Sequence, residues 1–380
     1  MRKAGDEMKN PFTFSNVVTG LDFCNRKKEQ KDLLEFIKSS QNVLLYSHRR
    51  TGKTSLIKQV FLGLKEQNPD IKALYIDLYG TTSEREFITR IFQQLNVLES
   101  GTEKLLSLLK NSIEKFSFQI SVDPATGSPT IAPAFKAADE NLVLKNLMGL
   151  LEKFSRKQKL VIALDEFQEV AQYANAEAFE KQLRSYIQQH DNICYIFSGS
   201  QQHLLSAMFQ SKGRAFYQQA ASYPLHEIET EHYLPWMKEL FDAGNISIST
   251  AQLAEIVERF GNHPMYIQLF CFFLWRELQD NPWDDRTMDR IERAVIDQKH
   301  LEYQMLWDNL TINQKKTVKL VLMNDGRNLF TAEALTAVAI STASIVTRCL
   351  KSLFEKEILV KNGKYIIQDL VLRKWLALNV

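Results

Sequence analysis

From Asn42 onward, short runs of apolar and β-branched residues alternate with longer segments in which apolar residues recur every three or four positions. This alternation is typical of a parallel sheet covered by helices, because parallel strands need long crossover connections. The expected strands are apolar at nearly every position, as strands buried on both faces are. They are Val43 to Tyr46, Ala73 to Leu78, Leu160 to Leu164, Ile193 to Ser198 and Ser222 to Leu225. The sequence therefore predicts an α/β domain with a five-stranded parallel sheet and helices on both faces.

Helical patterns separate these strands, as at Ser55 to Glu66, Glu84 to Leu98, Asn141 to Phe154 and Glu177 to Gln189. Residues 116–135 depart from this rhythm, because apolar and polar residues alternate singly before a turn that contains proline and glycine. A period of two followed by turn residues predicts a β-hairpin inserted among the helices. A disordered loop is the alternative for this segment.

The length of 380 residues fits two or three domains, and a hydrophobic fraction of 45% suffices for sizeable cores. After the last expected strand only helical patterns remain, at Glu229 to Ala243, Thr250 to Phe260 and Pro264 to Leu278. A charged helical stretch then runs from Asp284 to about Trp307. We therefore expect a core domain at residues 1–228 and a helical lid with a linker helix at residues 229–309.

Residues 310–380 are expected to form a winged-helix domain. Three helical segments come first, at Asn313 to Met323, Thr331 to Val338 and Ser341 to Phe354. Two short strands follow on either side of the turn Asn362-Gly363. Three helices and a small hairpin are the elements of a winged helix, which is a variant of the helix-turn-helix.

General features of the chain narrow the class of protein further. The longest nearly apolar run, Ile267 to Trp275, is far shorter than the roughly 20 residues that span a bilayer, so we expect no membrane partner. The first residues lack the apolar segment of a signal peptide, which predicts a cytoplasmic protein. The cysteines show no metal spacing and are expected to be reduced; they are Cys24, Cys194, Cys271 and Cys349.

The most informative motif follows the first expected strand and opens a helix. In the pattern G-x-x-x-x-G-K-[ST], backbone N–H groups surround nucleotide phosphates, the lysine reaches the β- and γ-phosphates, and the hydroxyl binds Mg²⁺. Gly52, Lys53 and Thr54 match this pattern, whereas a serine takes the place of the first glycine. The sequence predicts a site for ATP and Mg²⁺ with these cofactor-binding residues: Ser47, His48, Arg49, Arg50, Thr51, Gly52, Lys53, Thr54 and Ser55.

A second motif supplies carboxylates. The apolar run Leu160 to Leu164 ends in Asp165 and Glu166. In nucleotide hydrolases an aspartate at this position holds Mg²⁺, and a neighbouring carboxylate can activate the attacking water. We therefore expect Thr54 and Asp165 as metal ligands and Glu166 as the catalytic base. A strand between the two motifs, with Glu after Asp, favours a hydrolysing ATPase over a small nucleotide kinase. The acidic pair alone also fits a helix cap.

Two further positions are candidate catalytic residues. Ser200, with Ser198 as the alternative, follows the next strand and would orient the water or sense the γ-phosphate; a simple helix cap is the competing interpretation. Arg214 precedes the fifth strand and is a candidate arginine finger, in its own subunit or in a neighbouring subunit of a homo-oligomer. A surface arginine is the alternative at that position.

These residues resemble the prokaryotic, mainly archaeal-type ATPase family, a branch of the AAA+ and STAND P-loop NTPases. The resemblance covers the chain from about Asn10. The matching features are the entry box Phe23-Cys24-Asn25-Arg26-Lys27-Lys28-Glu29-Gln30, the Arg-Arg-x-Gly-Lys-Thr loop, Asp165-Glu166-Phe167-Gln168, Ser198-Gly199-Ser200, the Gly-x-His-Pro motif and Tyr365-Ile-Ile-Gln-Asp369.

The resemblance implies an AAA-like core, a helical lid and a winged helix, with ATP and Mg²⁺ as ligands. It implies that Lys53 and Thr54 bind phosphate and metal, that Asp165 binds the metal, and that Glu166 is the base. The family usually has Gly-Pro where this chain has Ser47 and His48, and we expect weakened affinity at worst from that departure.

The resemblance also implies that residues outside the two motifs lie near the nucleotide. It places Asn10, Pro11 and Arg26 near the adenine. The Gly-x-His-Pro motif, with His263 and Pro264, would bring the lid to the bound nucleotide, and a plain helix break is the alternative. The segment before the fifth strand differs from the family's usual Leu-Tyr-Gly-Arg, which weakens the finger assignment.

Charge is distributed unevenly along the chain. From Thr311 onward there are 11 Lys and Arg against 5 acidic residues, a net charge of +6, so the preceding residues carry −4 and the whole chain +2. In a DNA-reading winged helix the third helix enters the major groove and the wing contacts phosphate. The candidate DNA contacts are Ser341, Ser344, Thr347, Arg348 and Lys351 on that helix, with Lys361 and Lys364 in the wing. Packing of the winged helix on its own core is the alternative.

Three functions compete at this point. The first is a molecular switch in which ATP binding closes the lid and repositions the winged helix, with slow hydrolysis resetting it and a partner protein as recipient. The second is a DNA-associated motor or loader that hydrolyses ATP in an oligomer. The third, a regulator that never hydrolyses ATP, has no use for Glu166. The switch is the preferred hypothesis and the DNA-associated motor the alternative.

Overall fold

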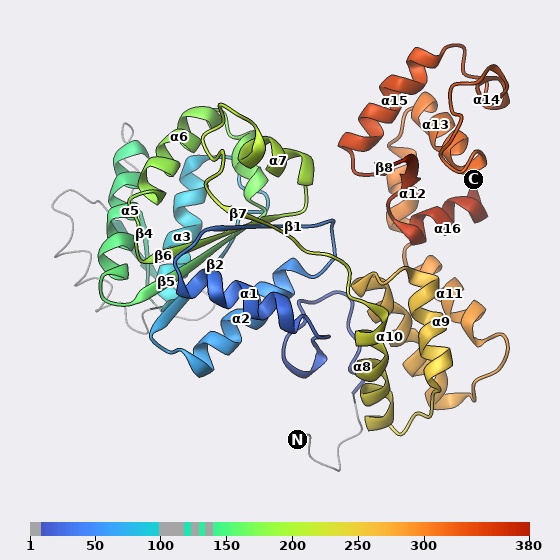
Figure 1. Ribbon diagram of the computed structural model, residues 1–380, viewed down its shortest axis with the longest axis horizontal. Helices are drawn as coiled ribbons and strands as arrows, with labels where there is room; N and C mark the ends of the chain where they lie inside the picture. Colours follow the sequence, from blue (N-terminus) through green and yellow to red (C-terminus); the bar gives the residue numbers. More distant parts are fainter. Residues whose placement is uncertain (1–8, 99–117, 123–128, 134–139) are drawn as a thin grey trace. The chain divides into compact units, whose positions relative to one another are not determined.

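The computed structural model describes residues 9–98, 118–122, 129–133 and 140–380 (Figure 1). The chain forms two compact units. The first unit is Val17–His226, and the second combines the segment up to Asn16 with Glu227–Val380. The chain therefore passes from one unit to the other twice, between Asn16 and Val17 and between His226 and Glu227.

The first unit is built on a five-stranded parallel sheet, which confirms the predicted fold class. Its strand order is β2-β5-β6-β1-β7. The register brings Asp77, at the end of β2, beside Asp165, at the end of β5. The strands are β1 (Val43–Tyr46), β2 (Ile71–Asp77), β5 (Lys159–Asp165), β6 (Ile193–Gly199) and β7 (Ala221–Pro224).

Alternate residues of the strands enter two separate hydrophobic cores, one on each face of the sheet. In β1, Leu44 packs into one core, while Val43 and Leu45 pack into the other. The first core is completed by α3 (Glu84–Leu98), α5 (Glu140–Ser155), α6 (Ala176–Ile187) and α7 (Gln202–Gln210), and the second by α1 (Lys27–Lys38) and α2 (Lys53–Gln67). The period of two along each strand thus places helices on both faces.

Burial on both faces holds for the central strands but not for the edges. β5 and β6 are buried along nearly their whole length, whereas β7 exposes Ala221, Ser222 and Pro224. The expectation of strands buried on both faces therefore does not hold for β7, and the other edge strand, β2, is only partly buried, because an edge strand has a neighbouring strand on one side only.

A separate two-stranded sheet lies within the segment for which a hairpin was expected. β3 (Phe118–Val122) and β4 (Pro129–Pro133) pair antiparallel, with Ile120 opposite Ile131. The remaining residues of that expected hairpin, 116–117, 123–128 and 134–135, lie outside the described residues.

After Glu227 the second unit continues with four helices of the expected lid: α8 (Thr230–Ala243), α9 (Thr250–Phe260), α10 (Pro264–Asp280) and α11 (Thr287–Gln298). The single helical stretch expected from Asp284 to Trp307 is instead divided at Lys299, where α11 ends and α12 (His300–Asp308) begins. No glycine or proline marks this break in the sequence. The division turns α12 so that it contacts both α11 and the C-terminal helix.

The winged helix follows the predicted order of elements. It consists of α13 (Ile312–Met323), α14 (Ala332–Ala337), α15 (Ala343–Glu355), β8 (Leu359–Asn362) and β9 (Lys364–Ile367). A further helix, α16 (Leu370–Asn379), was not anticipated from the sequence; it contacts α11 and α12 of the lid. Asp369 caps α16 by accepting hydrogen bonds from two backbone N–H groups of its first turn.

No helix among the described residues is long and apolar enough to cross a membrane. The four cysteines are buried and form no disulfide. Burial raises the pKa of Cys24 to about 12 and that of Cys194 to about 12, so both thiols stay protonated at neutral pH.

Candidate functional site

The loop between β1 and α2 has the conformation expected for a phosphate loop. Arg50 (φ 62°) and Gly52 (φ 96°) are left-handed, and glycine adopts such a φ without steric cost. The hydroxyl of Thr51 donates to the carbonyl of His48 at 2.8 Å and closes the loop on itself. Ser47 is not among the described residues with positive φ, so a serine at the place of the usual glycine causes no backbone strain.

Lys53 is the first residue of α2, and its side chain is buried. Its Nζ donates to the carbonyl oxygens of Ser47 at 3.1 Å and His48 at 3.0 Å, so the ammonium lies across the loop. Burial, and after it the charge of Lys53, lowers the pKa of His48, which is therefore neutral at pH 7. A buried cation at a helix N-terminus makes this loop a favourable place for phosphate.

Asp165 is the hub of the site. Its carboxylate accepts hydrogen bonds of 2.6 Å from the hydroxyls of Thr54, Tyr75 and Ser198, which come from α2, β2 and β6. The backbone N–H of Glu166 adds a fourth, at 3.1 Å. Burial and then the charge of Asp165 raise the pKa of Tyr75, so this phenol stays a hydrogen-bond donor.

Glu166 follows Asp165 in a left-handed conformation, with φ 53°. Its Oε2 accepts hydrogen bonds from the hydroxyl of Ser200 at 3.0 Å, from the backbone N–H of Ser200 at 3.3 Å and from Nε2 of Gln168. Ser198 and Ser200 were alternative candidates for one role, and both donate hydrogen bonds to a carboxylate of the site: Ser198 to Asp165 and Ser200 to Glu166.

The carboxylates of Asp165 and Glu166 line an open cleft of about 300 Å³ beside the phosphate loop. Burial, and after it the charges of Glu166 and Asp77, raises the pKa of the nearby Glu169. Carboxylate and hydroxyl oxygens are the ligands that Mg²⁺ prefers, so the donor set fits a magnesium ion. The lining residues are Val17, Thr54, Lys58, Tyr75, Asp77, Tyr79, Asp165 and Glu166.

Arg26, a candidate for the adenine site, braces the phosphate loop. Its buried guanidinium donates to the carbonyl of Thr51 at 3.2 Å, to the carbonyl of His226 at 2.5 Å and to Glu29 at 2.8 Å. It therefore links the loop to the last residue of the first unit. A role of Arg26 in binding adenine stays a prediction.

The other two adenine candidates, Asn10 and Pro11, belong to the second unit. The amide of Asn10 donates to the carbonyl of Phe272 in α10 at 2.9 Å and accepts the backbone N–H of Phe12 at 3.0 Å. Pro11 is buried. Asn10 thus anchors the N-terminal segment on α10, and contact of Asn10 and Pro11 with a nucleotide stays a prediction.

Arg214, the candidate finger, forms an ion pair with Glu180 of α6. Glu180 is almost fully buried, and its pKa is raised by burial in spite of the opposing charge of Arg214. The pair satisfies a buried carboxylate, which is a structural role. Action of Arg214 on a nucleotide, in its own or another subunit, stays a prediction.

The candidates of the lid motif, His263 and Pro264, lie where α9 gives way to α10. Pro264 is the first residue of α10, where a missing N–H costs nothing. The His263 ring lies 4.6 Å from that of Tyr266, between centroids. The hydroxyl of Tyr266 in turn donates to Asp369 of the winged helix. Contact of this motif with nucleotide stays a prediction.

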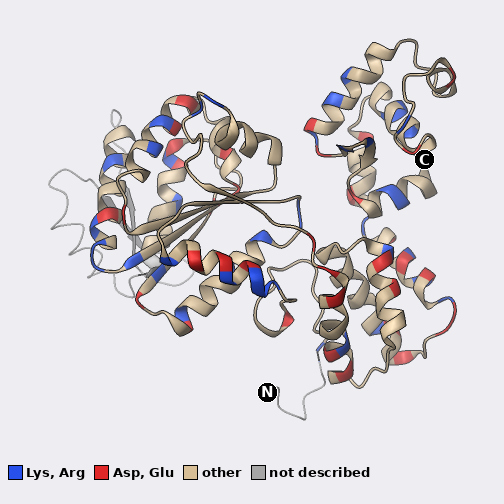
Figure 2. Cartoon of the chain, in the orientation of Figure 1, with Lys and Arg blue, Asp and Glu red and all other residues tan. Residues whose placement is uncertain are grey.

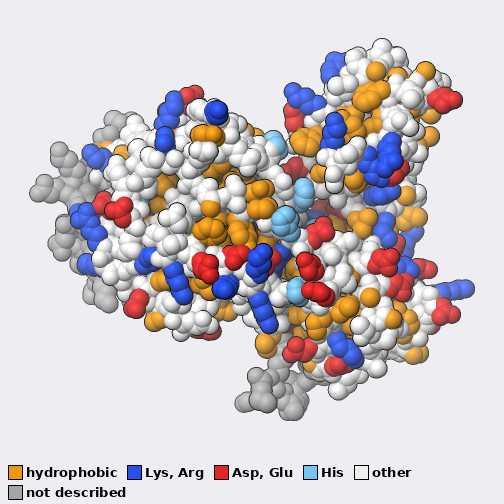
Figure 3. All heavy atoms as spheres, in the orientation of Figure 1, with side chains coloured by type: hydrophobic (Ala, Val, Ile, Leu, Met, Phe, Trp, Pro, Cys, Tyr) orange, Lys and Arg blue, Asp and Glu red, His pale blue; other side chains and the backbone are white. Residues whose placement is uncertain are grey.

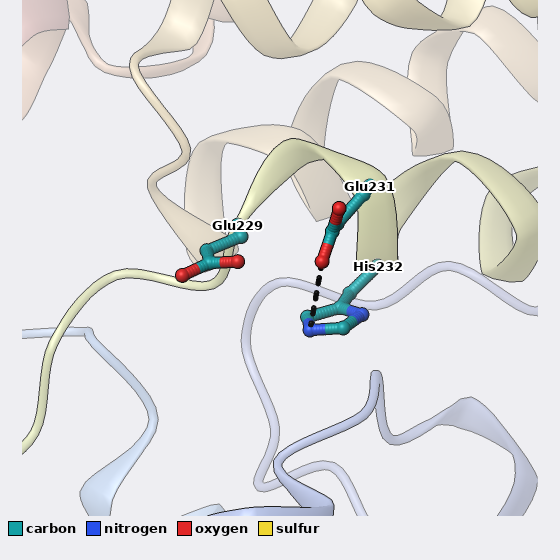
Figure 4. A group of neighbouring side chains, drawn as sticks. All are labelled: Glu229, Glu231 and His232. Atoms are coloured by element: carbon teal, nitrogen blue, oxygen red, sulfur yellow. Dashed lines mark ion pairs between the residues drawn. The ribbon is translucent and has the colours of Figure 1, made fainter.

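A second group of metal-ligating residue types lies at the start of α8. Glu229, Glu231 and His232 come close together there (Figure 4). The Glu231 carboxylate lies 3.8 Å from the His232 ring nitrogen Nε2, and the carboxylates of Glu229 and Glu231 are exposed to solvent. Exposed groups of this kind are well hydrated without an ion, so we assign no metal to them.

Sequence reasoning did not single out Tyr75, Lys58 or Gln168 as site residues. Lys58 lies over the Tyr75 ring at 4.7 Å from its centroid, and Tyr75 in turn contacts Asp165. Tyr75 lies in an expected strand, but only the order of the strands places β2 beside β5. Gln168 belongs to the quoted Asp-Glu-Phe-Gln motif, which was the available signal.

Residues 23–270 match the model of a family described as an ATPase domain predominantly from Archaea. Residues 301–378 match the model of a probable winged helix domain. No curated protein is significantly similar to the chain.

Several solved structures share the fold. A Walker-type ATPase of Pyrococcus abyssi superposes with a TM-score of 0.68 at 18% identity, covering 97% of this chain and 99% of that one. The ORC2 protein of Aeropyrum pernix, in ADPNP and ADP complexes, has a TM-score of 0.57 at 14% identity over 93% of both chains. The ORC1 protein of the same organism, in complex with DNA, has a TM-score of 0.50 at 12% identity over 94% of this chain and 93% of that one.

Proposed function

Because this chain belongs to the family of ATPase domains found predominantly in Archaea and ends in a winged helix, we propose that it is a Mg²⁺-dependent ATP switch. In this proposal ATP binding and slow hydrolysis reposition the winged helix for a partner protein. The single observation that carries the proposal is the joining of Thr54, Asp165 and Glu166 at the phosphate loop.

Each residue of the site has a defined task in this proposal. The phosphate loop and Lys53 would hold the β- and γ-phosphates, and Thr54 and Asp165 would hold Mg²⁺. When bound, Mg²⁺ neutralises charge on the phosphates. Glu166 would accept a proton from the attacking water, with Ser200 holding its carboxylate.

The second unit indicates how a change at the nucleotide could reach the winged helix. Asp369, at the start of α16, accepts hydrogen bonds from Tyr266 of α10 and from Tyr303 of α12, the latter at 3.1 Å. Lys374 of α16 pairs with Glu292 of α11 at 2.8 Å. The winged helix is thereby fastened to the lid, so we propose that the two move as one body.

Turnover and binding measurements on two variants test this proposal. We expect wild-type protein to bind ATP and hydrolyse it slowly, Lys53→Ala to lose binding, and Glu166→Gln to bind ATP but lose turnover by about 10²- to 10⁴-fold. Lys65→Ala, at the exposed end of α2, is the control for loss of a lysine. Absence of ATP binding by the wild type would refute the proposal.

DNA binding is the second candidate function. In Figure 2 the ribbons of α13, α15 and α16 carry Lys and Arg positions, and Figure 3 shows Lys and Arg atoms on the surface of this part of the chain. Arg348 and Lys361 are exposed, whereas Lys364 pairs with Asp325. The likeness in fold to an ORC1 protein that was solved with DNA adds support.

Salt dependence separates the two candidates. If the winged helix binds DNA, Arg348→Ala and Lys351→Ala should each weaken binding to duplex DNA and make it less salt-dependent, because each removes one phosphate contact. Lys299→Ala, in the lid, is the control. Duplex affinity that is immeasurable at low salt would leave the switch as the proposed function.

A further inference from the structure

Gln168 lies close to Glu166, in the short 3-10 helix η2 (Phe167–Gln172), and its side chain is almost completely buried. Its Nε2 donates to Glu166 Oε2, the oxygen that also accepts the two hydrogen bonds from Ser200. Three donors thus converge on Oε2, while none of the described residues donates to Oε1. The carboxylate is fixed in one orientation, and Oε1 keeps its capacity to accept a proton.

The position of Gln168 depends on a glycine in the neighbouring strand. A Cβ added to Gly199, the last residue of β6, would lie 2.0 Å from Oε1 of Gln168 and 3.2 Å from Cδ1 of Leu205. Gly199 is not among the described residues with positive φ, so the glycine is needed for space and not for its backbone conformation. The Gln168 amide occupies the room that a side chain at residue 199 would take.

This arrangement has an energetic cost. The amide oxygen of Gln168 is closed off from solvent and has no donor among the described residues. A buried carbonyl without a hydrogen bond is unfavourable, and such groups call for a functional explanation. Turning the amide over would place its oxygen against the Glu166 carboxylate, which repels it. The observed orientation therefore keeps the N–H on Glu166 at the expense of its own carbonyl.

We propose that Gln168 is a positioning residue that aims Glu166 at the attacking water, an inference that rests on the proposed ATP hydrolysis. In that step an O–H bond of water breaks, and its proton passes to Glu166 Oε1. The water oxygen bonds to the γ-phosphorus, and the bond to the bridging oxygen breaks with its electron pair leaving on ADP. Among the groups that take part in this step, Gln168 contacts the base Glu166 and acts through it.

Steady-state kinetics on Gln168→Glu and Gln168→Met test this role. Glu keeps the shape but replaces the donating NH₂ with an oxygen, and Met removes both polar atoms. We expect kcat to fall by about 10- to 100-fold in each, with KM and ATP affinity within about two-fold of wild type. Gln67→Glu, on the exposed end of α2, is the matched control and should leave both constants unchanged.

Thermal unfolding distinguishes positioning from a structural role. Gln168→Met removes the buried carbonyl that lacks a partner. The Tm of this variant should therefore be equal to that of the wild type or a few degrees higher, while its kcat falls. A clear drop in Tm together with unchanged kcat would overturn the proposal. A rise in kcat would also overturn it, because Gln168 would then restrain the base and not aim it.

A double-mutant cycle tests the contact with Gly199. Gly199→Ala should lower kcat by displacing the amide, but should change kcat little when Gln168 is already alanine. Gly149→Ala, on α5, is the control because an added Cβ there meets no atom within 4 Å. Strictly multiplicative effects of the two substitutions would contradict the proposed contact.

The failure of this inference differs from that of the proposed function. Lack of ATP hydrolysis by wild-type protein that binds ATP would refute the hydrolytic step and, with it, the role of Gln168. An active wild type with equally active Gln168 variants would refute the role of Gln168 alone.

Discussion

Asp165 in the first unit and Asp369 in the second have similar hydrogen-bond partners but different surroundings. Each carboxylate accepts tyrosine hydroxyls and backbone N–H groups. Asp165 lines an open cleft beside the phosphate loop, whereas Asp369 starts α16 and ties it to the lid. The comparison teaches that similar polar contacts can lie beside an open cleft, where we propose that a ligand binds, or can fasten one helix to others, as Asp369 fastens α16 to α10 and α12.

The tyrosines that donate to the two aspartates also differ in their surroundings. Tyr75 donates to Asp165 and lines the cleft with it, so the Mg²⁺ ion that we propose would share the carboxylate with Tyr75. Tyr303 is buried, and burial together with the charge of Asp369 raises its pKa, so it remains a donor at any physiological pH. The contact between Tyr303 and Asp369 is therefore not expected to open through ionisation of this tyrosine.

The same substitution should abolish most of the ATP turnover at Asp165 and leave it nearly unchanged at Asp369, and this is the largest difference we expect. Asp165→Asn removes the ligand that we propose for Mg²⁺ and should lower ATP turnover by at least about a hundred-fold. Asp369→Asn keeps an oxygen for the helix cap and should leave turnover within about two-fold. Steady-state ATPase assays measure both. Equal losses of activity would show that Asp369 takes part in hydrolysis and would break the comparison.

Removing the carboxylate of Asp369, which ties α16 to α10 and α12, should destabilise the second unit. Asp369→Ala removes the cap of α16 and leaves buried tyrosine hydroxyls without their acceptor, at a cost of about 2–4 kcal/mol in the free energy of unfolding. Hydrogen exchange of the α16 amides measures this directly. Asp242→Ala is the control, because that exposed carboxylate lies on α8, where it pairs with Lys238 of the same helix, and should matter much less. Unchanged protection of the α16 amides would contradict the role of Asp369 in fastening this helix.

Removing one tyrosine hydroxyl that donates to Asp165, and one that donates to Asp369, should affect different properties of the protein. Tyr75→Phe takes a donor from Asp165 and should shift the Mg²⁺ concentration needed for half-maximal turnover by a few-fold, corresponding to about 1 kcal/mol. Tyr303→Phe should instead lower the stability of the second unit by a similar amount, with the Mg²⁺ requirement unchanged. If both variants altered the Mg²⁺ requirement, the two aspartates would not be independent.

The smallest expected effect is on pH dependence. Burial lowers the pKa of both His48 and His190 in the folded state below the ordinary value of 6.5. The unfolded chain then binds protons more readily, so the stability of the first unit should fall as the pH drops below about 6.5. His190→Gln should flatten that decline in chemical denaturation between pH 7.5 and 5.5. An unchanged slope would remove His190 from the explanation.

Much of the fold followed from local patterns. The phosphate loop, the five strands and the order of elements in the winged helix were predicted because each depends on residues close together in sequence. The division of the charged helical stretch at Lys299 and the helix α16 were not predicted. Neither carries a glycine or proline signal, and both depend on packing between α11, α12 and α16.

By itself, the sequence determined the residue types of the candidate site: a lysine and a hydroxyl after a glycine, and two carboxylates at the end of an apolar strand. Only the tertiary structure decided which side chains meet there. Strand order brings Tyr75 and Ser198 to Asp165, and the absence of a side chain at Gly199 makes room for Gln168 beside Glu166. The physical reason is that motif spacing fixes local geometry, whereas the pairing of distant strands and the filling of space depend on the whole folded chain.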